Sequence, residues 1–170
     1  MEQNTPRSAG RIRRSVAKTT VARRRLRRLE RTHYLNVDLD ILSAAALDGL
    51  VQAIGDNVSV LYVGGESRQF EAHLELASQR LSTTPDRAIA GFVKLIDRLP
   101  PRHRKTWDRA QSREFNIGIE AGLVPHGFEL RLKRHTIEAI VAVRATLAVT
   151  IYAPDLQAVS RSQLRRIRGG

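Results

Sequence analysis

The chain contains no cysteine, one methionine and one tryptophan, and only 5% of its 170 residues are aromatic. The absence of cysteine excludes disulfide bonds, a thiol nucleophile, and cysteine-ligated zinc or iron–sulfur sites. No apolar run approaches the roughly 18–20 residues that cross a bilayer. The basic N-terminal stretch also lacks the apolar segment of a secretory signal. We therefore expect a cytoplasmic protein that uses none of these chemistries.

Lysine is also scarce, because 25 of the 29 basic residues are arginine. Arginine suits bidentate contacts with phosphates and carboxylates, so the excess is consistent with recognition of anions. A GC-rich genome favours arginine codons over lysine codons and produces the same excess without any functional cause. Both explanations stay open.

The basic charge is concentrated at the two ends of the chain. Residues 1–31 hold eleven basic and two acidic residues, residues 161–170 hold four basic residues, and the remaining 129 residues have a net charge of −1. The pI near 11.3 therefore describes the ends and not the body. We expect a basic arm over residues 1–31, disordered or helical, a single α+β domain over residues 32–154, and a basic tail over residues 155–170 that forms a short helix.

The arm supplies the candidate residues for binding a polyanion, which are Arg13, Arg14, Arg23, Arg24, Arg25, Arg27 and Arg28. Apolar residues at helical spacing from Ile12 to Leu29 favour a helix that orders on nucleic acid or another anionic surface. The alternatives are a solvated arm without regular structure and a stretch that lies upstream of the true start codon. Neither end interleaves aromatic residues with its arginines, so a base-stacking platform is not expected.

Between the ends, alternating and helical apolar patterns follow one another in the order βαββα(α)ββαβ. Six strands are expected over residues 35–41, 58–63, 70–76, 115–121, 128–133 and 148–152. Helix starts are indicated at Ser43, at Thr84-Pro85-Asp86, at Pro101 and at Thr136, and Gly55 is expected to end the first helix. This order predicts an α+β fold, a ferredoxin-like split βαβ sheet extended by a C-terminal βαβ unit, with the helices on one face.

Four segments carry a resemblance to a known family: Asn36–Asp40, Phe128–Leu130, Thr136–Ile140 and Thr150–Pro154. Their hydrophobic alternation resembles an uncharacterised bacterial family whose closing strand, helix and strand have the same pattern. The resemblance covers about residues 34–154 and implies the same fold. It implies no activity and no catalytic residue.

The most concentrated polar set in the body lies on the first and third expected strands and consists of Asp38, Asp40, Glu71, His73 and Glu75. These strands are neighbours in a ferredoxin-like sheet, so the five side chains are expected to share the face that the helices leave open, with Glu120 on the other side of the first strand. One interpretation is a binding site for a basic protein surface, and another is a divalent-metal or acid–base site. The third is a solvated face whose charges are relieved by Arg131 or Lys133.

The remaining motifs indicate no chemistry. The five histidines have no recognised metal-ligand spacing, Gly64-Gly65 is typical of a hairpin turn, and no Gly-x-Ser-x-Gly occurs. Trp107 is expected to anchor a short helix to the core and not to stack on a base.

No catalytic residue, metal ligand or cofactor is therefore assigned. We expect a non-enzymatic domain that binds a protein partner through its acidic sheet face. The alternatives are a nucleic-acid-binding protein that uses the arm and a metal-dependent enzyme at the Asp38/His73 cluster.

Overall fold

The computed structural model describes residues 31–122 and 127–153 of the chain. By internal packing the chain divides into two units. The larger one, Tyr34–Glu120 with Glu129–Tyr152, contains the helices and the sheet. In the smaller one, the Gly122 N–H donates to the Thr32 hydroxyl at 2.9 Å. The candidate arginines of the arm and the expected C-terminal helix lie outside the described residues.

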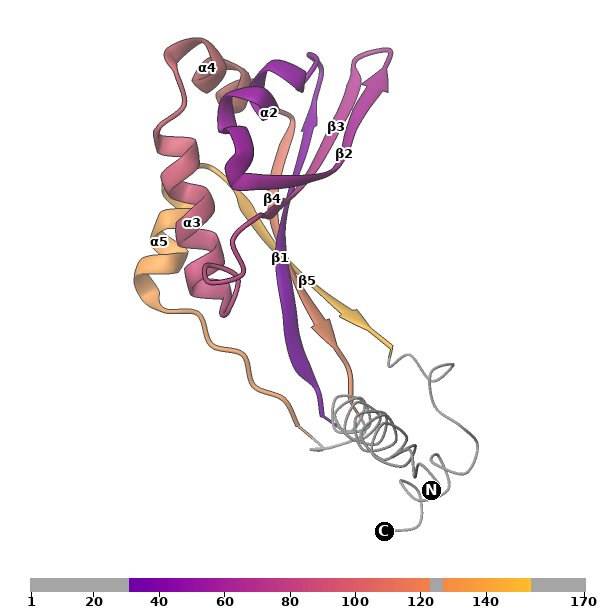
Figure 1. Ribbon diagram of the computed structural model, residues 1–170, viewed down its shortest axis with the longest axis vertical. Coiled ribbons are helices and arrows are strands. Elements are labelled where there is room, and N and C mark those ends of the chain that lie inside the picture. The colour runs from indigo at the N-terminus through magenta and orange to yellow at the C-terminus, as the bar shows by residue number, and fades with distance from the viewer. Residues whose placement is uncertain (1–30, 123–126, 154–170) are drawn as a thin grey trace, which may run out of the picture. The chain divides into compact units, whose positions relative to one another are not determined.

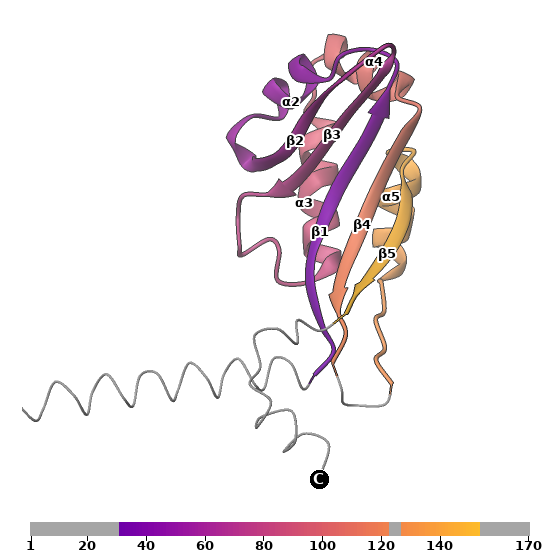
Figure 2. The same cartoon turned by 90° about the vertical axis from the view of Figure 1, so that its right-hand side faces the viewer.

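The larger unit is an α+β fold built on a five-stranded mixed sheet, with strand order β2-β3-β1-β4-β5 (Figures 1 and 2). The strands are β1 His33–Ser43, β2 Val58–Glu66, β3 Gln69–Leu76, β4 Ser112–Glu120 and β5 Thr146–Tyr152. β3 is antiparallel to both β1 and β2, whereas β4 and β5 are parallel. Parallel neighbours need a crossover connection, which here contains helix α5.

The helices of the described residues all lie on one side of the sheet, and none of them covers the other side (Figure 1). They are α2 Asp48–Ile54, α3 Pro85–Asp97, α4 Pro101–Arg109 and α5 Arg134–Ala142, with a short 3₁₀ turn at Gly55–Asn57. The apolar rows of β1, β3 and β4 face this helix layer and are buried with it, as the contact between Phe92 of α3 and Phe115 of β4 illustrates, with ring centroids 5.9 Å apart. Side chains on the other row of each strand face the open side of the sheet.

Three expected helix boundaries are confirmed, at Thr84, Pro101 and Gly55, and two are wrong, at Ser43 and Thr136. The Thr84 hydroxyl accepts the Arg87 N–H at 3.3 Å and caps α3, and Gly55, with φ of +72°, ends α2. Ser43 does not cap a helix. It is the last residue of β1, its hydroxyl accepts the Ala45 N–H at 3.1 Å, and α2 begins only at Asp48.

The expected strand over residues 128–133 is also wrong, because this segment pairs with no strand. Leu130 and Leu132 pack against the core from outside the sheet, and the Lys133 N–H donates to the Asp86 carboxylate at 3.0 Å. Their alternation therefore reflects one-sided packing and not membership of a sheet. The C-terminal βαβ unit starts at β4 instead, so the sheet has five strands and not six.

Helix α5 differs from its expected form. It starts after Lys133, and Thr136 lies buried in its first turn, where the threonine hydroxyl donates to Asp86. Of three apolar residues of this helix, Ile140 is buried but Ile137 and Val141 are exposed. A nine-residue helix places only part of its apolar surface against the layer, and here the remainder faces outward.

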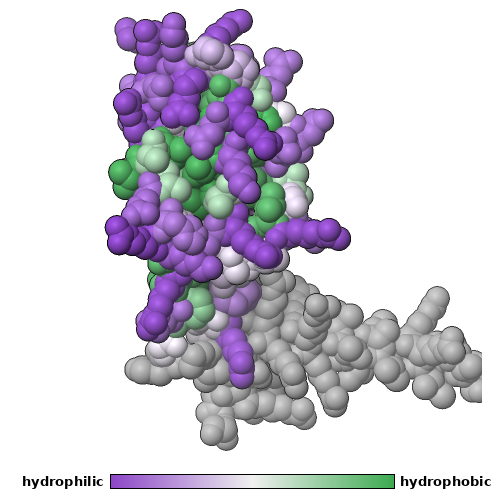
Figure 3. Space-filling view, turned by 90° about the vertical axis from the view of Figure 1, so that its left-hand side faces the viewer, coloured by the Kyte–Doolittle hydropathy of each residue, from purple (hydrophilic) through white to green (hydrophobic). Residues whose placement is uncertain are grey.

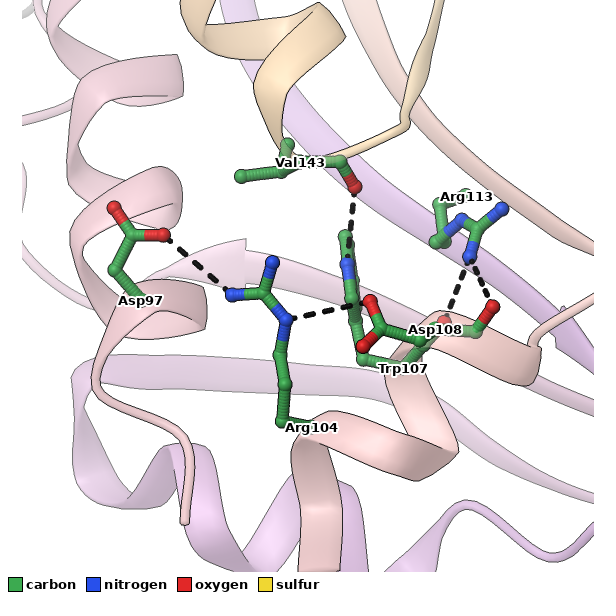
Figure 4. A network of polar contacts seen from close by, with 6 residues as sticks. All are labelled: Asp97, Arg104, Trp107, Asp108, Arg113 and Val143. Carbon is green, nitrogen blue, oxygen red and sulfur yellow. Dashed lines mark hydrogen bonds and ion pairs between the residues drawn. The ribbon is translucent and has the colours of Figure 1, made fainter. Parts of the chain in front are cut away.

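Trp107 anchors α4 to the core, as the sequence predicted. The side chain is fully buried, and its indole N–H donates to the Val143 carbonyl at 3.0 Å, just beyond the end of α5 (Figure 4). The Arg113 guanidinium donates to the Trp107 carbonyl at 2.8 Å. Nearby, Arg104 forms ion pairs with one carboxylate of α3 and one of α4. These contacts tie the three helices together at one end of the layer.

Candidate functional site

Strands β1 and β3 bring the five predicted residues together on the open face of the sheet. In the antiparallel register, Asp38 lies opposite Glu75 and Asp40 lies opposite His73. Directly opposed residues of an antiparallel pair point to the same side, and residues two apart on one strand do so as well. Glu71, two positions before His73, therefore completes the set, which we call the acidic cluster.

His73 is the cationic centre of the acidic cluster. Its Nδ1 atom lies 2.7 Å from Oδ1 of Asp40, and its Nε2 atom lies 3.5 Å from Oε2 of Glu71. The hydrogen bond to Asp40 raises the pKa of His73 above its ordinary value, and this outweighs the opposing effect of burial. On the neighbouring strand β2, the ring of Tyr62 lies with its centroid 5.8 Å from the imidazole. The cluster therefore favours a protonated imidazole.

Asp38 is the carboxyl group of the cluster whose ionised form is disfavoured by its surroundings. Burial, together with the negative charges of Glu75 and Asp40, raises its pKa to about 6, and His73 acts in the opposite direction. The side-chain amide of Asn36 donates to Oδ1 of Asp38 at 2.9 Å. The Asp38 carboxyl thus changes its charge near pH 6, which is unusual for aspartate.

Two residues of this region are absent from the predicted set, Tyr34 and Asn36. The Tyr34 hydroxyl is buried and has no hydrogen-bond partner among the described residues. Burial raises its pKa above the ordinary tyrosine value, and the charges of Asp38 and Glu75 add to this rise. Both residues share the even-numbered row of β1 with Asp38, so the same alternation would have identified them.

Gly118 on β4 makes room for Asn36. A Cβ atom at position 118 would lie 2.5 Å from Oδ1 of Asn36, a distance at which the amide would have to move. Only glycine therefore leaves the Asn36 side chain where it is, and it is this side chain that donates to Asp38. Beside it lies a shallow hollow of about 350 Å³ lined by Leu35, Asn36, Glu75 and Tyr152.

The near-neutral charge of the body conceals a separation of charge between its two sides. The five strands carry one arginine, Arg113, and seven carboxylates: Asp38, Asp40, Glu66, Glu71, Glu75, Glu114 and Glu120. Those of β1, β3 and β4 alternate with buried apolar residues and hence line the open face. The helices and loops between residues 44 and 145 carry thirteen Lys or Arg residues and seven Asp or Glu residues. The open face is acidic, and the helix layer is basic.

The predicted relief of the cluster by Arg131 or Lys133 is wrong. Arg131 pairs with Glu129, with Nε and Oε1 2.6 Å apart, and the backbone N–H of Lys133 is bound to Asp86. Both residues precede α5 on the other side of the fold, because the strand that was expected to carry them does not form. His73 is therefore the positive group that the described structure places in the cluster.

The metal alternative gains no geometric support. Within residues 31–122 and 127–153, no three His, Asp or Glu side chains are arranged to hold a metal ion together. The carboxylates of the acidic cluster are spread along two strands of a sheet face and do not converge on one point, which a divalent cation with several oxygen ligands requires.

The helix layer carries a basic groove of about 810 Å³ between α3 and the loop that precedes it. Its charged lining residues are four cations, Arg80, Arg87, Lys94 and Arg98, and one carboxylate, Asp56. Apolar side chains such as Leu81 and Leu95 also line it. The helix-covered side of the molecule accordingly shows a hydrophilic surface interrupted by apolar patches (Figure 3).

No helix in the described part of the chain is long and apolar enough to cross a membrane. Comparison of the sequence with protein-family models, with curated proteins and with solved structures gave no match. The family resemblance of residues 34–154 therefore stays an expectation from the sequence.

Proposed function

We propose that this protein is a non-enzymatic binding domain that recognises a basic surface of another protein through its acidic sheet face. The observation that carries the proposal is the crowding of carboxylates around Asp38, whose pKa burial and neighbouring charges raise to about 6. Like charges on adjacent strands destabilise a sheet. An arginine or lysine brought against Asp38 and Glu75 replaces that repulsion with attraction.

The proposal predicts a specific pH dependence. A cation bound at the cluster stabilises the ionised form of Asp38, so binding releases a proton wherever the free carboxyl is still protonated. Affinity should therefore rise as pH increases through about 6, the pKa of Asp38 in the free protein. A partner that bound elsewhere on the domain would show no such rise.

The experiment compares the unchanged protein with a variant that carries Asp38→Asn and Glu75→Gln. An arginine-rich peptide serves as the probe in calorimetric titrations at several pH values, and pull-downs from nuclease-treated lysate seek the natural partner. The matched control is Asp56→Asn with Glu138→Gln, which removes the same charge from the helix side. The proposal requires the sheet variant to lose binding while the control retains it, and equal loss in both variants refutes it.

A second candidate function, binding of nucleic acid or another polyanion, is favoured by the basic groove. Among the ion pairs of the described residues none involves the four cations of the groove, so the folded unit offers positive charge of its own, in addition to that of the arm. If about six to ten phosphates are engaged, affinity for DNA or RNA falls roughly 10³–10⁵-fold between 50 and 200 mM salt. Replacing Arg87 and Lys94 with alanine should reduce this salt dependence, whereas Asp38→Asn should not.

We also propose a fold assignment. The order β2-β3-β1-β4, with α3 and α4 leading into β4, supports a ferredoxin-like split βαβ sheet to which α5 and β5 are added. A cytoplasmic location is part of the same proposal and rests on the composition of the chain alone. A metal-dependent activity at Asp38 and His73 remains the third candidate, and no observation favours it.

A further inference from the structure

Strand β5 is an edge strand without the usual protection. It forms one border of the sheet, and its seven residues, Thr146–Tyr152, contain no charged residue and no proline. Natural edge strands are commonly shielded by lysine, proline or a β-bulge, because their free N–H and C=O groups otherwise pair with another chain. The opposite border, β2, has a register shift between Val60 and Tyr62, whereas the pairing of β5 with β4 is regular throughout.

Exposed apolar side chains lie on this strand and on α5, which packs against it. Leu147, Val149 and Ile151 lie beside Phe115, Ile117 and Ile119 of β4 and so point to the helix side, yet Val149 is 50% exposed and Ile151 is 67% exposed. On α5, Ile137 and Val141 are 51% and 68% exposed, and their spacing of four residues places them on the same side of the helix. α5 lies on the helix side of the sheet (Figure 1) and behind β5 when the open face is viewed (Figure 2).

We propose that a second copy of this chain covers this surface, through antiparallel pairing of the two β5 strands about a two-fold axis. Such a contact is self-complementary, because the same residues face each other from both copies. With the axis at Val149, the two Val149 side chains meet and Leu147 of each copy lies opposite Ile151 of the other. The pairing extends the sheet through both molecules and brings the exposed side of α5 toward its equivalent.

The exposed apolar area is sufficient for a specific dimer. The five side chains Ile137, Val141, Leu147, Val149 and Ile151 offer on the order of 500 Å² per copy, so two copies bury on the order of 1,000 Å², the lower bound for a biological interface. The edge backbone adds directional hydrogen bonds to this apolar contact.

The C-terminal residues of the same chain are a poorer match to this edge. The border of a sheet is completed by a strand, and the apolar residues after Pro154, such as Leu156, Val159 and Leu164, are spaced as in a helix and do not alternate. β5 of a second copy has the required length, polarity and alternation. We therefore assign the surface to a second copy.

The test uses the full chain and three variants. Sedimentation and light scattering at about 100 µM protein should give a dimer mass. Val149→Lys should give a monomer that keeps its circular dichroism spectrum, whereas Val60→Lys on the opposite border should remain dimeric. Because the chain has no cysteine, Val149→Cys should form a disulfide-linked dimer under mild oxidation.

Three outcomes would overturn the proposal. The first is a monomer mass for the unchanged chain, the second is equal dissociation by Val60→Lys, and the third is a dimer that Val149→Cys does not crosslink. If the unchanged chain is monomeric and Val149→Lys lowers its melting temperature, another segment of the same chain covers the surface and the dimer is refuted.

Discussion

Replacing Asp38 with asparagine should stabilise the protein near neutral pH. The change removes the charge that burial, Glu75 and Asp40 all oppose, and it keeps an oxygen that accepts the Asn36 amide. The pKa rises from 3.8 to about 6. Each pKa unit corresponds to about 1.4 kcal/mol, and solvent screening of this half-buried group reduces the total, so we expect a gain of about 1–2 kcal/mol in the free energy of unfolding.

The pH dependence of this gain follows from the direction of the shift. A carboxyl whose pKa is raised by folding binds more protons in the folded than in the unfolded state. The unchanged protein therefore carries no penalty from Asp38 below about pH 4, and the penalty develops as pH rises through about 6. Asp38→Asn should gain nothing at about pH 4 and its full amount at about pH 7.5.

Urea unfolding followed by circular dichroism at these pH values measures the effect. Asp56→Asn on the helix side is the control, because it removes one negative charge that lies outside the acidic cluster. A loss of stability in Asp38→Asn near neutral pH would refute the reasoning, since it would mean that the ionised carboxylate is stabilised and not penalised. A gain of equal size at all pH values would refute it as well.

Three further outcomes are expected. Phe92→Ala or Ile117→Ala should cost about 2–5 kcal/mol in the free energy of unfolding, measured with urea, because both side chains are fully buried in the core. Asp86→Ala should cost about 1 kcal/mol near neutral pH, since it removes the acceptor of two hydrogen bonds from the start of α5. Hydrogen bonds hold the pKa of Asp86 below its ordinary value despite burial, so this cost should vanish as pH falls below about 4. A chain that starts at Thr32 should give the same melting temperature as the full chain, because the core residues lie after that position.

The alternation of polar and apolar residues was sufficient to predict the acidic cluster. Asp38, Asp40 and His73 were placed on one face because a strand has a period of two, and because the order of elements made the first and third strands neighbours. Both are local or topological properties that a sequence displays directly. The register that sets Asp40 against His73 depends on hairpin and sheet geometry that this pattern does not contain.

The errors have a common physical cause. Residues 128–133 alternate as a strand does, but alternation reports one-sided burial and does not show whether a partner strand is within reach. Ile137 and Val141 have the helical spacing of core residues but are exposed. An apolar residue type indicates a tendency to be buried, and it does not indicate which surface buries it. The charge of the body was misleading in another way, because a net value near zero contains no information about how opposite charges are distributed between two faces.

The lack of a side chain at Gly118 on β4 makes the residue allowed at this position depend on Asn36 and Asp38 of β1, which are far away in the sequence. Any larger residue there displaces the Asn36 amide, and Asp38 then loses its hydrogen-bond donor while its carboxylate neighbours remain. Substitution at position 118 should therefore be tolerated only together with a smaller residue at position 36 or an uncharged one at position 38. In related sequences, we expect positions 36, 38 and 118 to vary together. Glycine at position 118 should then accompany asparagine at position 36 and aspartate at position 38.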